Sequence, residues 1–195
     1  MAAAEPIRDK RHIKKMTDYY LKKNEFRNYL LVIMGLHTAL RISDLLSLRW
    51  RDVVDFQTRI FNRYVHITEK KTGKNKVIAL NDLVINELKI YFDVAKHSAP
   101  TDFIFSNNRK KNPGPINRIQ AYRIIKNAAG ELNIEGNISC HSLRKTFGYH
   151  AWKKQVPIAV IMDIYNHSSF EITRRYLGIC QDDRDKVYLE MSFLN

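Results

Sequence analysis

Four side chains in the last third of the chain carry groups that could act on a phosphate. Residues 140–176 contain His141 and Arg144, then His167, then Tyr176. A tyrosine phenol has a pKa of about 10, so it ionises more readily than a serine hydroxyl and can attack phosphorus with modest help. Arginine grips phosphate oxygens through its planar fork, and histidine manages protons near neutral pH. The set predicts an enzyme that cuts and rejoins a phosphodiester through a covalent tyrosine link.

A second arginine lies much earlier in the chain, within residues 38–44, where Asp44 follows Arg41 by three positions. The two share a face if this segment is helical. A bare local pair of this kind is more often a surface salt bridge that contributes little to stability. Because this pair lies in an apolar run, with Leu40 and Leu45 as expected core residues, we favour a buried and oriented arginine.

Residues 59–80 change to the period of strands and predict a β-hairpin with a basic tip. We expect its turn to close at Thr72 and Gly73, with Lys71 just before the turn. Lysines on such a tip usually serve solubility alone. A lysine there can also reach into a groove, and near other cations its pKa falls and it becomes a competent acid. The register leaves three neighbours as alternatives: Lys70, Lys74 and Lys76.

Composition narrows the class of protein. The 195 residues include 33 Lys and Arg against 20 Asp and Glu, for a formal charge of +13, and the chain is long enough for one domain with a substantial core. Such a charge indicates a polyanionic partner, and nucleic acid is the commonest one. No run approaches the ~20 apolar residues of a membrane helix, and the N-terminus lacks a secretory core. Two cysteines, Cys140 and Cys180, form no disulfide framework or zinc-type pair, so we expect a cytoplasmic protein without a metal.

Periodicity predicts a mainly helical α+β fold with a small antiparallel β-sheet. Asn24, Asn81 and Ser139 are expected helix caps. Helices are expected over residues 8–23, 25–37, 83–96, 116–132 and 141–154, with shorter ones opening at Pro157 and spanning 171–176. The basic helix over 8–23 could present a solvated face or contact phosphates.

Three finer expectations concern the middle of the chain. Ile119 and Tyr122 should face inward on the helix over 116–132, and residues 102–105 should form a short strand. Residues 106–115 are rich in Pro, Gly and Asn and predict a loop. Its basic side chains could touch a DNA backbone, although a solvated loop is the simpler interpretation: Arg109, Lys110 and Lys111.

In chain order the candidate groups are Arg41, Lys71, His141, Arg144, His167 and Tyr176. With the motifs TALRISD, KTGK, HSLRKT, the Asn-His turn and RRY, this order resembles the catalytic domain of the tyrosine recombinase (phage integrase) family over about residues 19–176. Each motif alone is common. Taken singly, Tyr176 would be an ordinary half-buried helix tyrosine and the histidines core residues, but jointly those readings require six coincidences.

The resemblance implies a nucleophile and a phosphate clamp. Tyr176 would attack the scissile phosphate and form a 3′-phosphotyrosyl bond, releasing a 5′-hydroxyl, while Arg41 and Arg144 would hold the non-bridging oxygens. Because the phosphotyrosine conserves the bond energy, neither ATP nor a metal ion is implied, and no cofactor is expected.

It also implies the proton-transfer and supporting groups. Lys71 would protonate the leaving 5′-oxygen, and His141 would assist proton transfer at the tyrosine. His167 would hydrogen-bond the phosphate, and Asp44 would orient the arginine and histidine side chains. Three positions depart from the family pattern without removing a catalytic group. Ala39 stands where glycine is frequent, Lys145 where a second histidine is common, and Asn166 where glycine usually precedes the histidine.

The expected organisation is a single catalytic domain over residues 1–195. Family members usually add an N-terminal core-binding domain, which is expected to be absent here, as in short members such as fimbrial phase-switch recombinases or in a fragment. Residues 183–195 form a tail or helix with apolar side chains that would pack on its own core or dock on a neighbouring protomer.

The expected function is site-specific recombination or integration of double-stranded DNA, typical of mobile elements, by a homotetramer on two DNA sites. Accessory DNA-bending proteins are candidate partners, and no membrane partner is expected. The alternatives are a type IB topoisomerase-like activity, or a non-catalytic DNA-binding or regulatory protein with the same fold.

Overall fold

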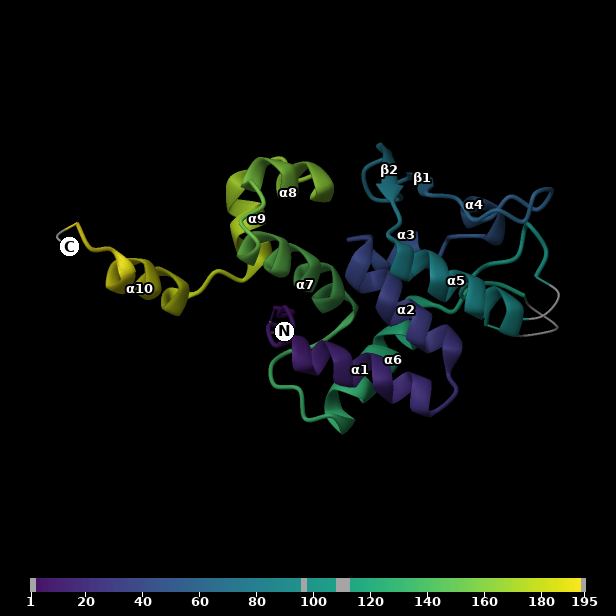
Figure 1. Cartoon of the computed structure of the whole chain (residues 1–195), viewed down its shortest axis with the longest axis horizontal. Coiled ribbons are helices and arrows are strands. Elements are labelled where there is room, and N and C mark those ends of the chain that lie inside the picture. Colours follow the sequence, from purple (N-terminus) through teal and green to yellow (C-terminus); the bar gives the residue numbers. More distant parts are fainter. Residues whose placement is uncertain (1–2, 96–97, 108–112, 194–195) are drawn as a thin grey trace.

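The computed structural model describes residues 3–95, 98–107 and 113–193, which form ten helices and one two-stranded antiparallel sheet (Figure 1). The predicted class, α+β and mainly helical with a small antiparallel sheet, is confirmed. The elements in chain order are α1 (Lys10–Lys22), α2 (Phe26–His37), α3 (Ile42–Leu45), α4 (Trp50–Val53), β1 (Tyr64–Thr68), β2 (Asn75–Ala79), α5 (Asp82–Val94), α6 (Arg118–Glu131), α7 (Cys140–Lys153), α8 (Ile158–Tyr165), α9 (Phe170–Leu177) and α10 (Gln181–Glu190).

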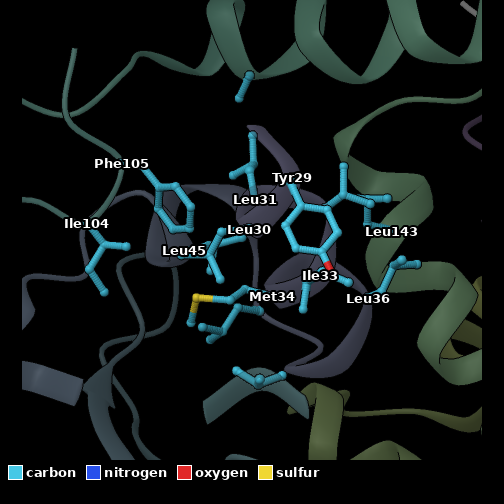
Figure 2. Close-up of a cluster of buried hydrophobic side chains, with 14 of the residues drawn as sticks. Tyr29, Leu30, Leu31, Ile33, Met34, Leu36, Leu45, Ile104, Phe105 and Leu143 are labelled. Atoms are coloured by element: carbon cyan, nitrogen blue, oxygen red, sulfur yellow. The ribbon is translucent and has the colours of Figure 1, made fainter. Parts of the chain in front are cut away.

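Helix α2 forms the centre of the main core. It is buried from Asn28 to Leu36, because it is apolar on nearly all sides and packs against α1, α5 and α7. Figure 2 shows its side chains beside Phe105 and Leu143. A Cβ atom on Gly35 would lie 2.6 Å from Leu143 Cδ1, so α2 and α7 approach closely. This contact anchors α7, the helix that carries two of the candidate site residues.

Capping follows the sequence at two of the three predicted positions. Asn81 accepts the Val84 N–H at 2.9 Å at the start of α5, and Ser139 forms a capping box with Ser142 at the start of α7. The prediction for Asn24 was wrong. It has φ +54° in the tight connection after α1, and Glu25 is the residue that precedes α2.

The β-hairpin has the predicted position and turn. The strands pair from Tyr64 with Ala79 to Thr68 with Asn75. Gly73 has φ +67° and donates its N–H to the Glu69 carbonyl at 2.8 Å, which closes the turn in a conformation that favours glycine.

Two expectations in the middle of the chain were wrong. Residues 102–105 form a single bridge, Arg49 with Phe103, and no strand, because Ile104 and Phe105 are held by core burial and by a bond from the Ile104 N–H to the Leu48 carbonyl. On α6 the small stripe of Ala121, Ala128 and Ala129 faces the core together with Ile125, which leaves Ile119 62% and Tyr122 45% exposed. Arg109, Lys110 and Lys111 lie outside the described residues.

Helices α7, α8 and α9 pack together around a second, smaller core of Ala39, Ile161, Tyr165 and Leu177. Helix α10 follows α9 and projects from this body (Figure 1). Its apolar residues remain open to solvent, Leu189 at 86%. None of the helices in the described part of the chain is both long and apolar enough to cross a membrane.

Candidate active site

Arg144 lies at the centre of the candidate site and is 1% exposed. Its Nη1 donates to the Ala39 carbonyl and its Nη2 to the Tyr165 carbonyl, the latter at 3.0 Å. The third nitrogen, Nε, is buried and has no hydrogen-bond partner among the residues that the structure describes. Burial lowers the pKa of Arg144, but a guanidinium stays charged at neutral pH. The protein therefore holds a fixed cation between α7 and the segment before α3.

Tyr165, the last residue of α8, packs its ring against the guanidinium of Arg144. Its ring centroid lies 4.6 Å from Arg144 Cζ, and its hydroxyl donates to the Arg144 carbonyl at 2.6 Å. The ring fits against α7 only because residue 148 is glycine: a Cβ there would lie 2.3 Å from the Tyr165 hydroxyl. Sequence reasoning missed Tyr165, since a buried tyrosine at a helix end carries no distinctive local pattern.

Tyr176, on α9, faces His141 on α7. The Tyr176 hydroxyl lies 3.3 Å from His141 Nδ1, and the two rings meet edge to face. Burial raises the pKa of Tyr176, while the positive charge of Arg144 acts in the opposite direction. Burial of the imidazole, and then the positive charge of Arg144 and other cations, lowers the pKa of His141 to about 4. Part of the residue is still open to solvent. At pH 7 the imidazole is neutral and can accept a proton.

His167 lies in the connection between α8 and α9, next to the same tyrosine. Its Nδ1 is 3.0 Å from the hydroxyl of the fully buried Thr173, and its ring centroid is 4.9 Å from that of Tyr176. Burial and then the charge of Arg144 lower the pKa of His167 to about 4. Asn166, which comes before it, ends α8 with φ +52°, a conformation that asparagine tolerates better than most residues.

Arg41 differs from the expectation. It is the residue before the short helix α3, and its Nη1 forms an ion pair at 2.7 Å with Glu69 Oε2, not with Asp44. The hairpin folds back over α3 and buries Glu69 completely. Burial by itself raises the pKa of Glu69, but hydrogen bonds from Arg41 and Thr72 outweigh it and lower the pKa to about 2. Glu69 precedes a run of lysines, and sequence reasoning considered only those lysines as site candidates.

Asp44 is buried and performs a different local task. Its Oδ1 accepts the backbone N–H of Lys70 at 3.0 Å, which ties the hairpin turn to α3. Asp44 therefore contacts the turn that bears Lys71, instead of the Arg41 side chain that the sequence suggested.

The hairpin offers two lysines of opposite character. Lys71 is exposed on the turn, yet its charge acts on His141. Lys76, on β2, is partly buried, and its Nζ donates to the Ile164 carbonyl at the end of α8. Burial and then Arg144 lower the pKa of Lys76 to about 8. Lys70 and Lys74 are exposed.

Ala39, one of the three departures from the family pattern, has φ +53°. This is the left-handed region, which an L-residue with a Cβ adopts at a cost of about 1–2 kcal/mol. Lys145, another departure, is buried, donates to the Arg175 carbonyl at 3.3 Å and lies 5.5 Å from the Tyr176 ring centroid.

The charges of this cluster act on one another although they come from distant parts of the chain. Arg41 and Arg144 both act on His141 and His167, and Tyr176 acts on Arg144. A groove of about 560 Å³ opens beside His141 and is lined by Arg118, Ile119 and Tyr122 of α6. Within residues 3–95, 98–107 and 113–193, no three His, Cys, Asp or Glu side chains gather as metal ligands. The arrangement can bind an anion and transfer a proton next to a phenol.

This fold, with a helix-borne tyrosine among arginines and histidines, is that of the tyrosine recombinases. A crystal structure of XerA recombinase superposes with a TM-score of 0.75 at 19% identity, over 97% of this chain and 64% of that one. XerH recombinase bound to a palindromic difH substrate gives a TM-score of 0.72 at 19% identity, over 91% of this chain and 50% of that one.

The profile of the phage integrase family matches residues 9–181, and the chain belongs to this family of tyrosine-type site-specific recombinases. It is 38% identical over 188 residues to the probable integrase/recombinase YoeC of Bacillus subtilis (strain 168), covering 96% of this chain and 97% of YoeC. It is 27% identical to a tyrosine recombinase of Pseudothermotoga lettingae, covering 88% of this chain but 56% of that protein. The chain thus spans nearly all of one relative and about half of the other.

Proposed function

We propose that this chain is a site-specific DNA recombinase or integrase that cleaves and rejoins strands through a 3′-phosphotyrosyl bond at Tyr176. One observation carries the proposal: the Tyr176 hydroxyl lies 3.3 Å from His141 Nδ1, beside the buried guanidinium of Arg144. This arrangement supports a nucleophile, a proton acceptor and a phosphate-binding charge in one site, as nucleophilic catalysis requires.

In the cleavage step the Tyr176 oxygen forms a bond to phosphorus while the bond from phosphorus to the 5′-oxygen breaks. The phenol proton passes to His141, which is neutral at pH 7 because its pKa is about 4. Arg41 and Arg144 neutralise the non-bridging oxygens as the transition state forms. Rejoining is the reverse, with the 5′-hydroxyl as nucleophile and Tyr176 as leaving group.

His167 is assigned to a phosphate oxygen. Its Nδ1 is engaged by Thr173, so Nε2 is the ring nitrogen that would face the substrate. Four buried or partly buried cations, Arg41, Lys76, Arg144 and Lys145, stand against the two carboxylates of Asp44 and Glu69. The excess of positive charge suits a bound phosphate.

The leaving 5′-oxygen needs a proton, and we assign it to Lys71, whose exposed turn can approach DNA. Lys76 is the rival, since it is close to the same charges. A substrate with sulfur in place of the 5′-oxygen separates them, because a thiolate leaves without protonation. Lys71→Ala should cleave the sulfur substrate at nearly the wild-type rate and the normal substrate slowly. If the sulfur substrate restores cleavage by Lys76→Ala and not by Lys71→Ala, Lys76 is the proton donor.

Double-stranded DNA is the proposed partner, supported by the charge of +13 and by the groove beside His141. Similar structures include a lambda integrase dimer bound to a core site and a transposon integrase bound to circular-intermediate DNA. Recognition would use the exposed side of α6, where Arg118, Ile119 and Tyr122 border the groove. Accessory DNA-bending proteins stay a prediction, to be tested by adding purified candidates to the recombination assay.

We propose that the chain acts as a homotetramer on two DNA sites, with α10 of one copy docked on the next. The tail has exposed apolar side chains such as Tyr188 and Leu189, and acidic residues in its first turn. A groove of about 630 Å³ between α1, α2 and α7 is lined by apolar side chains such as Leu36 and Phe147 and by the lysines Lys10, Lys14 and Lys154. The apolar and basic lining complements the apolar and acidic side chains of such a tail. Leu189→Asp should prevent assembly on DNA in sedimentation experiments while leaving the free chain folded.

Covalent trapping tests the function directly. A double-stranded oligonucleotide nicked next to the scissile phosphate releases a short fragment on cleavage, so the adduct cannot be reversed. Wild-type protein should form an adduct, seen as a band of reduced mobility in a denaturing gel, and Tyr176→Phe should form none. Salt-sensitive binding without an adduct would indicate a non-catalytic DNA-binding protein. Relaxation of supercoiled plasmid without a specific site would indicate a topoisomerase.

A cytoplasmic location stays a prediction, checked by cell fractionation.

A further inference from the structure

A short N-terminal segment, residues 5–8, lies across the helices of the candidate site; we name it the N-terminal strap. It precedes residue 9, where the match to the family profile begins. Ile7 is buried, its N–H donates to the Thr146 hydroxyl at 2.8 Å, and its carbonyl lies 3.1 Å from His150 Nε2. Both partners belong to α7, so the strap is fixed to the helix that carries His141 and Arg144.

The other end of the strap reaches the C-terminus of α9. Arg8 Nη2 donates to the Gly178 carbonyl at 2.7 Å, and Arg8 Nη1 lies 3.4 Å from Cys180 Sγ. Gly178 ends α9 with φ +66°, two residues after Tyr176, and a Cβ there would lie 3.0 Å from Pro6 Cγ. A cation at a helix C-terminus is favoured by the free carbonyls and by the helix dipole.

We propose that Arg8 is a positioning residue that holds the nucleophile helix α9 in register with α7. The strap links α7 to α9, two helices separated in the chain by α8. Its contacts follow His141 on α7, at Thr146 and His150, and follow Tyr176 at the end of α9, at Gly178. This proposal rests on the proposed strand cleavage at Tyr176. Lys145 gives α9 a second tie through the Arg175 carbonyl, so loss of Arg8 should loosen α9 without releasing it.

The reaction itself offers a readout that a merely structural residue would not move. In cleavage, a free Tyr176 must be ordered before it attacks. In rejoining, Tyr176 is already bonded to the phosphate, and this covalent bond fixes the position of Tyr176 without the strap. Loss of Arg8 should therefore raise the barrier to cleavage and leave the barrier to rejoining nearly unchanged, whereas loss of a phosphate-binding arginine should raise both.

The experiment uses the full chain and a nicked duplex whose sequence is selected from a random pool by binding to Tyr176→Phe. Arg8→Ala should form the covalent adduct about 10–100 times more slowly than wild type. Purified adduct, given a strand with a free 5′-hydroxyl, should rejoin within about threefold of the wild-type rate. Arg8→Lys should recover much of the cleavage rate. Arg11→Ala is the matched control, because Arg11 is 87% exposed and pairs only with Asp9 among the described residues.

Cleavage by Arg8→Ala at the rate of Arg11→Ala would overturn the proposal, as would equal slowing of cleavage and rejoining. DNA affinity and thermal midpoint, measured in parallel, should match those of wild type, and a fall in both would also count against positioning. Failure of the proposed function has a different signature: wild-type protein forms no adduct, or Tyr176→Phe still forms one.

Discussion

Arg144 is 1% exposed and held by two backbone carbonyls, whereas Lys71 stands on an exposed turn of the hairpin. Both charges act on His141. The helical side of the site, formed by α7, α8 and α9, is thus fixed before any substrate binds. The hairpin side is anchored through the backbone of Lys70 and the side chain of Glu69, where β1 enters the turn, while the Lys71 side chain stays exposed.

The two sides suit two chemical tasks. The protein stabilises the charge of the transition state best when its cations and dipoles do not have to rearrange during the reaction. This favours a buried arginine with fixed partners. A proton donor must reach an oxygen whose position depends on the bound DNA, which favours a mobile side chain such as lysine. The following predictions test this division, from the largest expected effect to the smallest.

Arg144→Ala should damage both activity and stability. Cleavage should fall by at least about 10²–10³-fold, because a preorganised charge is lost. The carbonyls of Ala39 and Tyr165 also lose their donor, and each buried acceptor left alone costs about 1–3 kcal/mol. Covalent trapping and urea unfolding measure the two effects. A variant with the unfolding free energy of wild type would show that this side is not rigid.

Lys71→Ala should affect activity alone. Loss of a general acid should slow cleavage about 10²-fold, while the unfolding free energy should change by less than about 0.5 kcal/mol, as for most surface substitutions. Lys74→Ala, on the same exposed turn, is the matched control and should cleave normally. A large loss of stability in Lys71→Ala would contradict the picture of a free tip.

Gly148→Ala tests the packing beneath Arg144. The new Cβ would lie 2.3 Å from the Tyr165 hydroxyl, so the ring must shift, and such overpacking costs about 1–3 kcal/mol. Gly130→Ala on α6 is the control, since its Cβ would meet nothing within 4 Å, and it should stabilise the helix by up to about 1 kcal/mol. Equal thermal midpoints for the two variants would refute the tight contact.

The pH dependence of stability should report the neutral histidines of the rigid side. The pKa of His167 is about 4 in the folded protein, below its ordinary value of about 6.5 in an unfolded chain. Between these values the unfolded state binds the proton and the folded state does not. Stability should thus be complete above about pH 6.5 and decline as the pH falls toward 4. His167→Gln should make this decline shallower in urea unfolding.

Ala39→Gly should give the smallest change and a gain. Because Ala39 has φ +53°, removal of its Cβ relieves strain of about 1–2 kcal/mol, partly offset by the greater freedom of glycine in the unfolded chain. We expect a net gain below about 1 kcal/mol, seen as a higher thermal midpoint. A lower midpoint would show that Ala39 is not strained in this turn.

Much of the fold could be predicted because it depends on local patterns. The apolar stripes predicted α1, α2, α5, α6 and α7 within a few residues, and Thr72 with Gly73 predicted the turn. The exposed side of α6 could not be predicted, since Ile119 and the buried Ile125 look alike until the direction of the core is known. The same holds for residues 102–105, which form a single bridge with Arg49 and pack into the core without becoming a strand.

The sequence by itself determined which reactive groups are present and in what order, because residue types and their spacing are local facts. Only the tertiary structure decided that Arg41 pairs with Glu69, that Lys76 is partly buried while Lys71 is exposed, and that residues 5–8 reach the end of α9. These outcomes depend on contacts between distant segments and on the removal of water from charged groups, and neither is written in any short stretch of the chain.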